Sequence, residues 1–117
     1  MIVPKLLNLS CSALARGEPP ANPRHCLVYM LATVGPDTGN AGDDFSFTVA
    51  TPSALAESER FGWGRGTLIV DSFSWLQVEH SLNRLLAQAS RSSWQEVAQT
   101  LNHELQWEFD GYRPYGG

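Results

Sequence analysis

The sequence contains little that would place it in a specialised class of protein. It has only two cysteines, Cys11 and Cys26, in 117 residues, so it lacks both a disulfide framework and a Cys-x-x-Cys pair. No apolar run approaches the roughly 20 residues that a membrane-spanning helix needs. Pro4 and Lys5 interrupt the apolar start that a signal peptide would require. We therefore expect a cytoplasmic protein with reduced thiols and no membrane partner.

Basic residues are also scarce. The chain has 8 lysines and arginines against 12 aspartates and glutamates, which gives a net charge of −4. Proteins that bind nucleic acid usually present a basic patch to the phosphates, so this balance argues against nucleic acid as the direct partner. It favours solubility or a basic protein partner.

The composition that remains is that of a globular protein, with 43% hydrophobic and 17% charged residues. A chain of this length can bury about two-thirds of its unfolded surface in one core. No internal repeat or low-complexity tail divides it. We expect a single domain over residues 1–117.

The first half of the chain has the pattern of a sheet. Phe45, Phe47 and Val49 alternate with small residues, which predicts a half-buried strand with one apolar face. Proline-rich and Gly/Asp-rich stretches separate this strand from its neighbours and predict loops. The expected elements are strands at 2–9, 25–35 and 44–51, loops at 10–24 and 35–44, a helix from Pro52 to about Ser58, and a short buried strand at 67–71.

The second half has the period of amphipathic helices. One helix is predicted from Ser74, and Ser93 with Glu96 forms a capping box that opens a second long helix. Their apolar stripes are Trp75, Val78, Leu82, Leu85, Leu86 and Ala89 in the first helix and Trp94, Val97, Ala98, Leu101 and Leu105 in the second. The predicted fold class is α+β, an antiparallel sheet of three to five strands with two C-terminal amphipathic helices packed on one face.

The sequence offers no convincing catalytic or metal-binding constellation. The glycines of the 60–66 loop are wrongly spaced for a dinucleotide fingerprint, and a strand follows them instead of preceding them. His25, His80 and His103 are scattered and have no ligand pair at a suitable spacing. Without a partner group, the carboxylates are interpreted as solvated surface charge. We expect no catalytic site, no cofactor and no metal.

Three segments share their order and motifs with a known family. They read FSFTVATPSAL, GRGTLIVDSFSW and SSWQEVAQTLNHELQWEFDGYR, and the shared region covers roughly residues 44 to 113. In these segments the chain resembles the immunity protein 8 family of bacterial polymorphic toxin systems, most specifically from Trp94 to Tyr112. The resemblance implies a non-catalytic inhibitor that binds a cognate toxin domain, and nucleases are common among such toxins. The alternatives are a small-molecule-binding or enzymatic α+β domain and a non-catalytic subunit of a larger complex.

Two loops are the predicted toxin contacts. Tight protein inhibitors combine a few aromatic or Arg anchors with charges at the rim, and an acidic surface can occupy a basic cleft. The 37–44 and 57–65 loops offer such residues. The candidates are Asp37, Asp43, Asp44, Glu57, Glu59, Trp63 and Arg65.

The aromatic tail is interpreted as scaffold. A stretch shared by proteins that face different toxins is expected to hold the fold together, with Trp107 and Phe109 buried and Glu108 and Asp110 pointing outward. The motif residues are Trp94, Glu96, Leu101, Trp107, Glu108, Phe109 and Tyr112. The sequence leaves the oligomeric state open.

Overall fold

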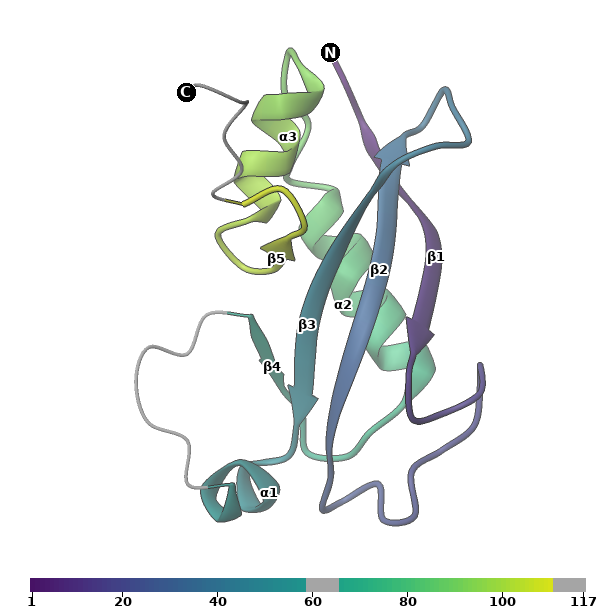
Figure 1. Ribbon diagram of the computed structural model, residues 1–117, viewed down its shortest axis with the longest axis vertical. Coiled ribbons are helices and arrows are strands. Elements are labelled where there is room, and N and C mark those ends of the chain that lie inside the picture. The colour runs from purple at the N-terminus through teal and green to yellow at the C-terminus, as the bar shows by residue number, and fades with distance from the viewer. Residues whose placement is uncertain (59–65, 111–117) are drawn as a thin grey trace.

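A sheet forms the frame of the protein. The computed structural model describes residues 1–58 and 66–110. In this part of the chain, three long strands pair antiparallel in sequence order, and two short strands share the free edge of the third (Figure 1). The strands are β1 (Pro4–Cys11), β2 (Leu27–Pro36), β3 (Asp43–Ala50), β4 (Thr67–Ile69) and β5 (Gln106–Trp107).

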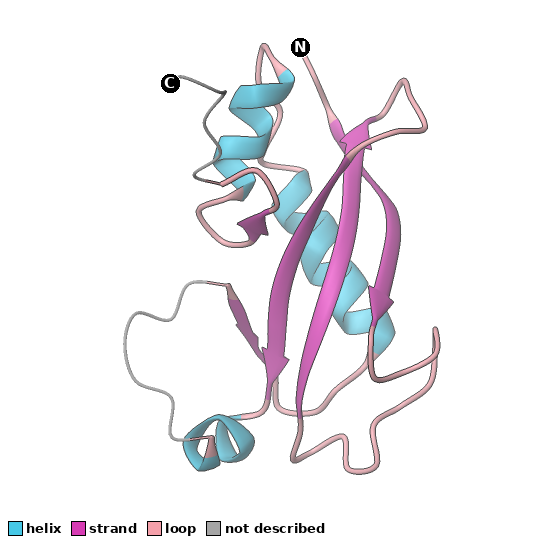
Figure 2. Ribbon diagram, viewed as in Figure 1, coloured by secondary structure: helices cyan, strands magenta, loops and turns pink. Residues whose placement is uncertain are grey.

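The helices complete an α+β fold. They are α1 (Pro52–Glu57), α2 (Trp75–Leu86) and α3 (Trp94–Leu101). In the view of Figure 1, α2 crosses behind the three long strands, and no helix lies in front of β2 and β3; Figure 2 shows the same arrangement by element type. The predicted fold class is confirmed. Within the described residues, no helix is both long enough and apolar enough to cross a membrane.

One strand pair departs from the antiparallel pattern. α1 connects β3 to β4 and brings β4 back parallel to β3, with Val49 opposite Leu68. The prediction of a buried strand over 67–71 was wrong in its extent and its burial, because β4 stops at Ile69, whose exposed fraction is 58%. β4 lies at the edge of the sheet, so only part of its surface is covered.

The core lies between the sheet and the helices. Alternate residues of β2 and β3 point to this side, as the period-two pattern of β3 predicted. They meet the apolar stripes of α2 and α3. The buried side chains include Val28, Met30, Ala32, Val34, Phe45, Phe47, Val49, Val78, Leu82, Leu86, Val97, Ala98 and Leu101.

Serine side chains fix where the two main helices begin. Ser74 accepts a hydrogen bond from the backbone N–H of Gln77, and Ser93 accepts one from that of Glu96 at 3.2 Å. The Ser93 half of the predicted capping box is therefore confirmed. The Glu96 carboxylate accepts hydrogen bonds from the hydroxyls of Ser92 and Ser93, so it steadies the cap through side chains.

Helix α3, the second of the two long helices predicted in the C-terminal half, is shorter than predicted. α3 ends at Leu101, and the side-chain oxygen of Asn102 accepts a hydrogen bond from the backbone N–H of Trp107 at 2.9 Å, which closes a turn. Leu105 is buried, as its place in the stripe suggested, but it reaches the core from this turn. Spacing alone did not reveal the helix end, since the apolar residues continue past it.

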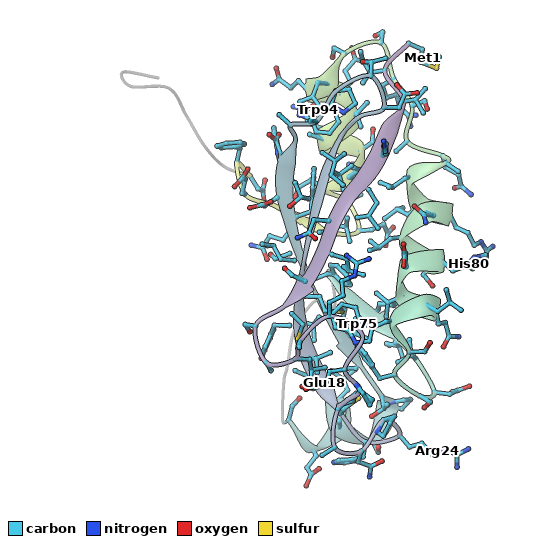
Figure 3. All side chains as sticks on the ribbon, turned by 90° about the vertical axis from the view of Figure 1, so that its right-hand side faces the viewer. Met1, Glu18, Arg24, Trp75, His80 and Trp94 are labelled. Carbon is cyan, nitrogen blue, oxygen red and sulfur yellow. The ribbon has the colours of Figure 1, made fainter. Side chains whose placement is uncertain are left out.

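The proline-rich loop before β2 is tethered to α2. The indole N–H of Trp75 donates a hydrogen bond to the backbone carbonyl of Glu18 at 2.8 Å. Figure 3 shows Trp75 and Glu18 close together at the lower end of the sheet, and His80 on the side of α2 that faces away from the sheet. A single aromatic side chain therefore packs against the core and holds an irregular segment.

Candidate protein-binding site

One carboxylate joins three separate elements at the end of the sheet where the chain turns from β2 into β3. Oδ2 of Asp43 accepts hydrogen bonds from the indole N–H groups of Trp94 and Trp107, each at 2.9 Å. Asp43 begins β3, Trp94 begins α3 and Trp107 lies in β5. Hydrogen bonds to an ionised acceptor are stronger than neutral ones. This carboxylate therefore holds the helix and the edge strand against β3.

These two hydrogen bonds from Trp94 and Trp107 to Asp43, here called the indole clasp, change the interpretation of Asp43. This residue was expected on an exposed loop. Its side chain is half-buried and its carboxylate is engaged by the protein's own indoles. A solvated surface carboxylate was therefore the wrong description of it. Its direct contact with a partner is a prediction that the structure leaves untested.

The burial predicted for the tail was only partly correct. Trp107 is half-buried and packs against the core, but Phe109 has an exposed fraction of 43% and meets Trp107 edge to face with ring centroids 5.9 Å apart. The chain turns after β5, where the backbone N–H of Asp110 donates to the carbonyl of Trp107 at 3.0 Å. This turn places Phe109 at the surface, whereas Glu108 and Asp110 are exposed as expected.

Two other acidic side chains near the clasp are held in place. Asp44 accepts a hydrogen bond from the hydroxyl of Thr33 at 2.7 Å. Glu108 accepts one from the backbone N–H of Asp44 at 3.1 Å. Asp37, the remaining acidic candidate of the hairpin, is exposed, and its backbone N–H donates to the carbonyl of Val3. Hydrogen bonds thus order the carboxylates beside β3, while the Asp37 side chain lies in solvent.

The hairpin between β2 and β3 packs tightly because of two glycines. A Cβ atom at Gly35 would collide with the backbone carbonyl of Ala41, and one at Gly42 would collide with that of Val34. Larger residues at these positions would push the connection away from β2. The connection between β2 and β3, which carries Asp37, therefore has a defined position at the end of the sheet.

The second predicted contact region lies at the opposite end of the sheet and is described only in part. Glu57, at the end of α1, contacts Nε2 of His25, and Nδ1 of His25 is 2.9 Å from the Ser53 hydroxyl. Both side chains are exposed to solvent, so this contact contributes little to stability. The other candidates of this loop, Glu59, Trp63 and Arg65, lie outside the described residues, as does Tyr112 of the tail motif.

The side of the sheet opposite α2 carries a coherent surface, here called the helix-free face. Its residues follow from the pairing register, because residues directly opposite on neighbouring strands share a face. Ser10, Leu31, Ser46 and Gln106 form one row across β1, β2, β3 and β5. The other rows are Tyr29, Thr48 and Thr67; Asn8, Thr33 and Asp44; Lys5 and Gly35; and Leu27, Ala50 and Ile69.

Large apolar side chains are exposed on the helix-free face. The exposed fractions are 60% for Tyr29, 40% for Leu31 and 58% for Ile69. Their neighbours in the same rows are mainly small hydroxyl residues and an amide; Thr48 and Ala50 are themselves buried, with exposed fractions of 6% and 0%. Beside Tyr29 lies a hollow of about 200 Å³, lined in part by Ser46, Thr67 and Gln106. The face thus combines an apolar centre with uncharged polar neighbours, and charged residues such as Asp44 lie in the rows farther out.

A second hollow lies on the other side of the same edge. Its volume is about 230 Å³, and apolar side chains of β3, β4 and α2 form most of its wall, with Glu104 beside them. It is too small for a typical drug-sized ligand. Within residues 1–58 and 66–110, no group of three or more His, Cys, Asp or Glu side chains could hold a metal ion.

Sequence reasoning missed Tyr29 and Leu31. The available signal was the alternation of β2, in which Val28, Met30 and Ala32 are buried while the residues between them are exposed. Two helices can cover one face of such a sheet, so the apolar residues of the opposite parity had to lie at the surface.

These features define a class of protein: a small scaffold that presents a structured surface, typical of a protein-binding module. A family model described as Immunity protein 8 matches residues 5–112. The chain belongs to the immunity protein 8 family, so it has an immunity role in toxin systems and a toxin protein as its partner. The match extends the resemblance noted over residues 44 to 113 to the N-terminal strand and both loops. No curated protein and no solved structure matches the chain significantly.

Proposed function

We propose that this protein neutralises a cognate toxin domain by binding it directly and occluding the surface the toxin needs, without catalysis and without a cofactor. The observation that carries this proposal is the family match over residues 5–112. An inhibitor of this kind needs a rigid surface and no reactive groups. The ordered hairpin, the indole clasp and the helix-free face are consistent with that requirement.

We further propose that the toxin has a basic surface, as a nuclease does around its phosphate-binding cleft. The net charge of −4 and the ordered carboxylates of Asp44 and Glu108 support this. Opposite charges steer association and raise its rate. Asp37, Asp44 and Glu57 are proposed as charged contacts. Asp43 is proposed to act by holding Trp94 and Trp107 in place.

Co-expression tests the function. The chain is produced together with the C-terminal domain of the toxin encoded beside it. We expect growth to be rescued and the two proteins to co-purify as a one-to-one complex. Continued toxicity with a folded, abundant chain would refute the proposal. Rescue without a complex would instead indicate an enzyme or an indirect mechanism.

A further inference from the structure

The helix-free face has the composition of an interface centre. Such centres are poor in charged residues and enriched in aromatic ones, and charges lie at their rim. Here the row of Leu31 and the row of Tyr29 contain only Ser, Thr, Gln, Leu and Tyr. Asp44 lies in the next row, with Glu108 hydrogen-bonded to its backbone.

Tyr29 and Leu31 are suited to be the anchors. They are two residues apart on β2, the central one of the three long strands, so their side chains stand on the same face of the sheet. Tyr is among the residues that most often dominate binding energy, especially next to a pocket. The hollow of about 200 Å³ beside Tyr29 could receive a side chain of the partner.

Order in the surrounding groups reduces the cost of binding. The register fixes Ser46 between β2 and β5, and the Thr33 hydroxyl holds the Asp44 carboxylate at 2.7 Å. A surface already ordered in the free protein loses little conformational freedom on association. The rim is acidic beside β3 and β5, where Asp44 and Glu108 lie, whereas Lys5 lies in the row opposite Gly35 on β1. The acidic part favours a partner that places lysine or arginine next to the apolar centre.

We infer that the helix-free face, centred on Tyr29 and Leu31, is the surface that contacts the cognate toxin, and that Asp44 and Glu108 pair with basic residues of that toxin. This inference rests on the proposed function. It assigns the anchoring role to a face that the loop prediction did not include. The occupant is the toxin domain, a protein with a basic surface, and not a second copy of this chain.

The first experiment uses association and dissociation rates to distinguish the anchors, Tyr29 and Leu31, from the rim residues Asp44 and Glu108. Binding of the purified toxin domain is measured with immobilised full-length chain. Tyr29→Thr with Leu31→Thr keeps residues that favour strands and should weaken binding at least about 100-fold through faster dissociation. Asp44→Asn with Glu108→Gln keeps the acceptor oxygens and should instead slow association and flatten its salt dependence.

Matched controls make the result specific. Leu76→Gln removes an apolar side chain that is 77% exposed on α2, away from this face, and should leave affinity unchanged within about twofold. Ser46→Arg adds bulk and positive charge at the centre of the face, and Gln88→Arg adds the same group beyond the end of α2. We expect the first to abolish binding and the second to be neutral.

The outcomes separate the two proposals. If the wild-type chain neither protects nor binds, the proposed function fails. If the wild type binds and both Tyr29→Thr/Leu31→Thr and Ser46→Arg bind equally well, only the assignment of the face is wrong. If the double variant does not fold, the binding of Ser46→Arg by itself decides whether the toxin contacts the helix-free face. A free chain that is a dimer by light scattering, and becomes monomeric in the double variant, would assign this face to self-association and overturn the inference.

Discussion

The two faces of β2 differ in burial although both carry large side chains with apolar surface. Val28 and Met30 have exposed fractions of 7% and 2%, whereas Tyr29, between them in sequence, is 60% exposed. The difference is set by which side the helices cover. Apolar character therefore does not by itself mark a core residue in this protein. On the covered side it stabilises the fold, and on the bare side we propose that it serves recognition.

The largest expected effect comes from truncating the covered side. Phe45→Ala removes a side chain with no exposed surface and should lower the free energy of unfolding by about 3–5 kcal/mol. Ser46→Ala, the adjacent residue on the helix-free face, should change it by less than about 0.5 kcal/mol. Urea denaturation followed by tryptophan fluorescence measures both. Equal losses at the two positions would abolish the distinction between the faces.

The clasp should give the next largest effect. Asp43→Ala leaves the indole N–H groups of Trp94 and Trp107 without their acceptor and should cost about 2–3 kcal/mol. Asp43→Asn keeps an oxygen acceptor but loses the charge, so about 1 kcal/mol is expected. Denaturation gives the energies, and the NMR shifts of the two indole protons report the bonds directly. Unchanged indole shifts in the alanine variant would show that the clasp does not form in solution.

The cap of α3 should contribute less. Ser93→Ala removes the acceptor for the backbone N–H of Glu96 and should cost about 1 kcal/mol. Ser92→Ala is the matched control, because its hydroxyl reaches the Glu96 carboxylate and not the backbone. It should change stability by less than about 0.5 kcal/mol. If the control cost as much as Ser93→Ala, the Glu96 carboxylate rather than the cap would be the stabilising contact.

The smallest effect is expected at Cys26. Burial raises the pKa of its thiol above the ordinary value of 9.0. The unfolded chain therefore ionises first as the pH rises, so this contribution to stability is present below pH 9.0 and is lost as the pH passes through the folded pKa. Iodoacetamide labelling mapped by mass spectrometry should show a pH–rate midpoint higher in the native chain than in urea. Coincident midpoints would contradict the raised pKa.

Local signals predicted much of the fold. The alternation of Phe45 and Phe47, the helical stripes and the serine at the start of α3 are all patterns among residues that are close together in the sequence. Such local patterns do not depend on long-range packing, and the structure confirms all three. The predicted length of α3 and the burial of Phe109 were wrong, because a turn held by Asn102 and the position of β5 at the sheet edge decided them.

The candidate site was less predictable than the fold. The loop residues were chosen for charge and aromatic character, and their role as toxin contacts stays a prediction. Tyr29 and Leu31 carry a local signal, their parity on β2, but parity does not say which of the two faces is covered. That choice depends on where α2 packs, a long-range outcome.

By itself, the sequence determined where most strands and helices begin and which residues of each share a face, because these depend on period and on neighbouring side chains. It also carried the family motifs of the C-terminal half. Only the tertiary structure decided which face α2 covers, where α3 ends, and that Asp43 serves two indoles 51 and 64 residues away. Contacts at such separations leave no periodic trace in the chain, so they appear only once the sheet and helices have packed together.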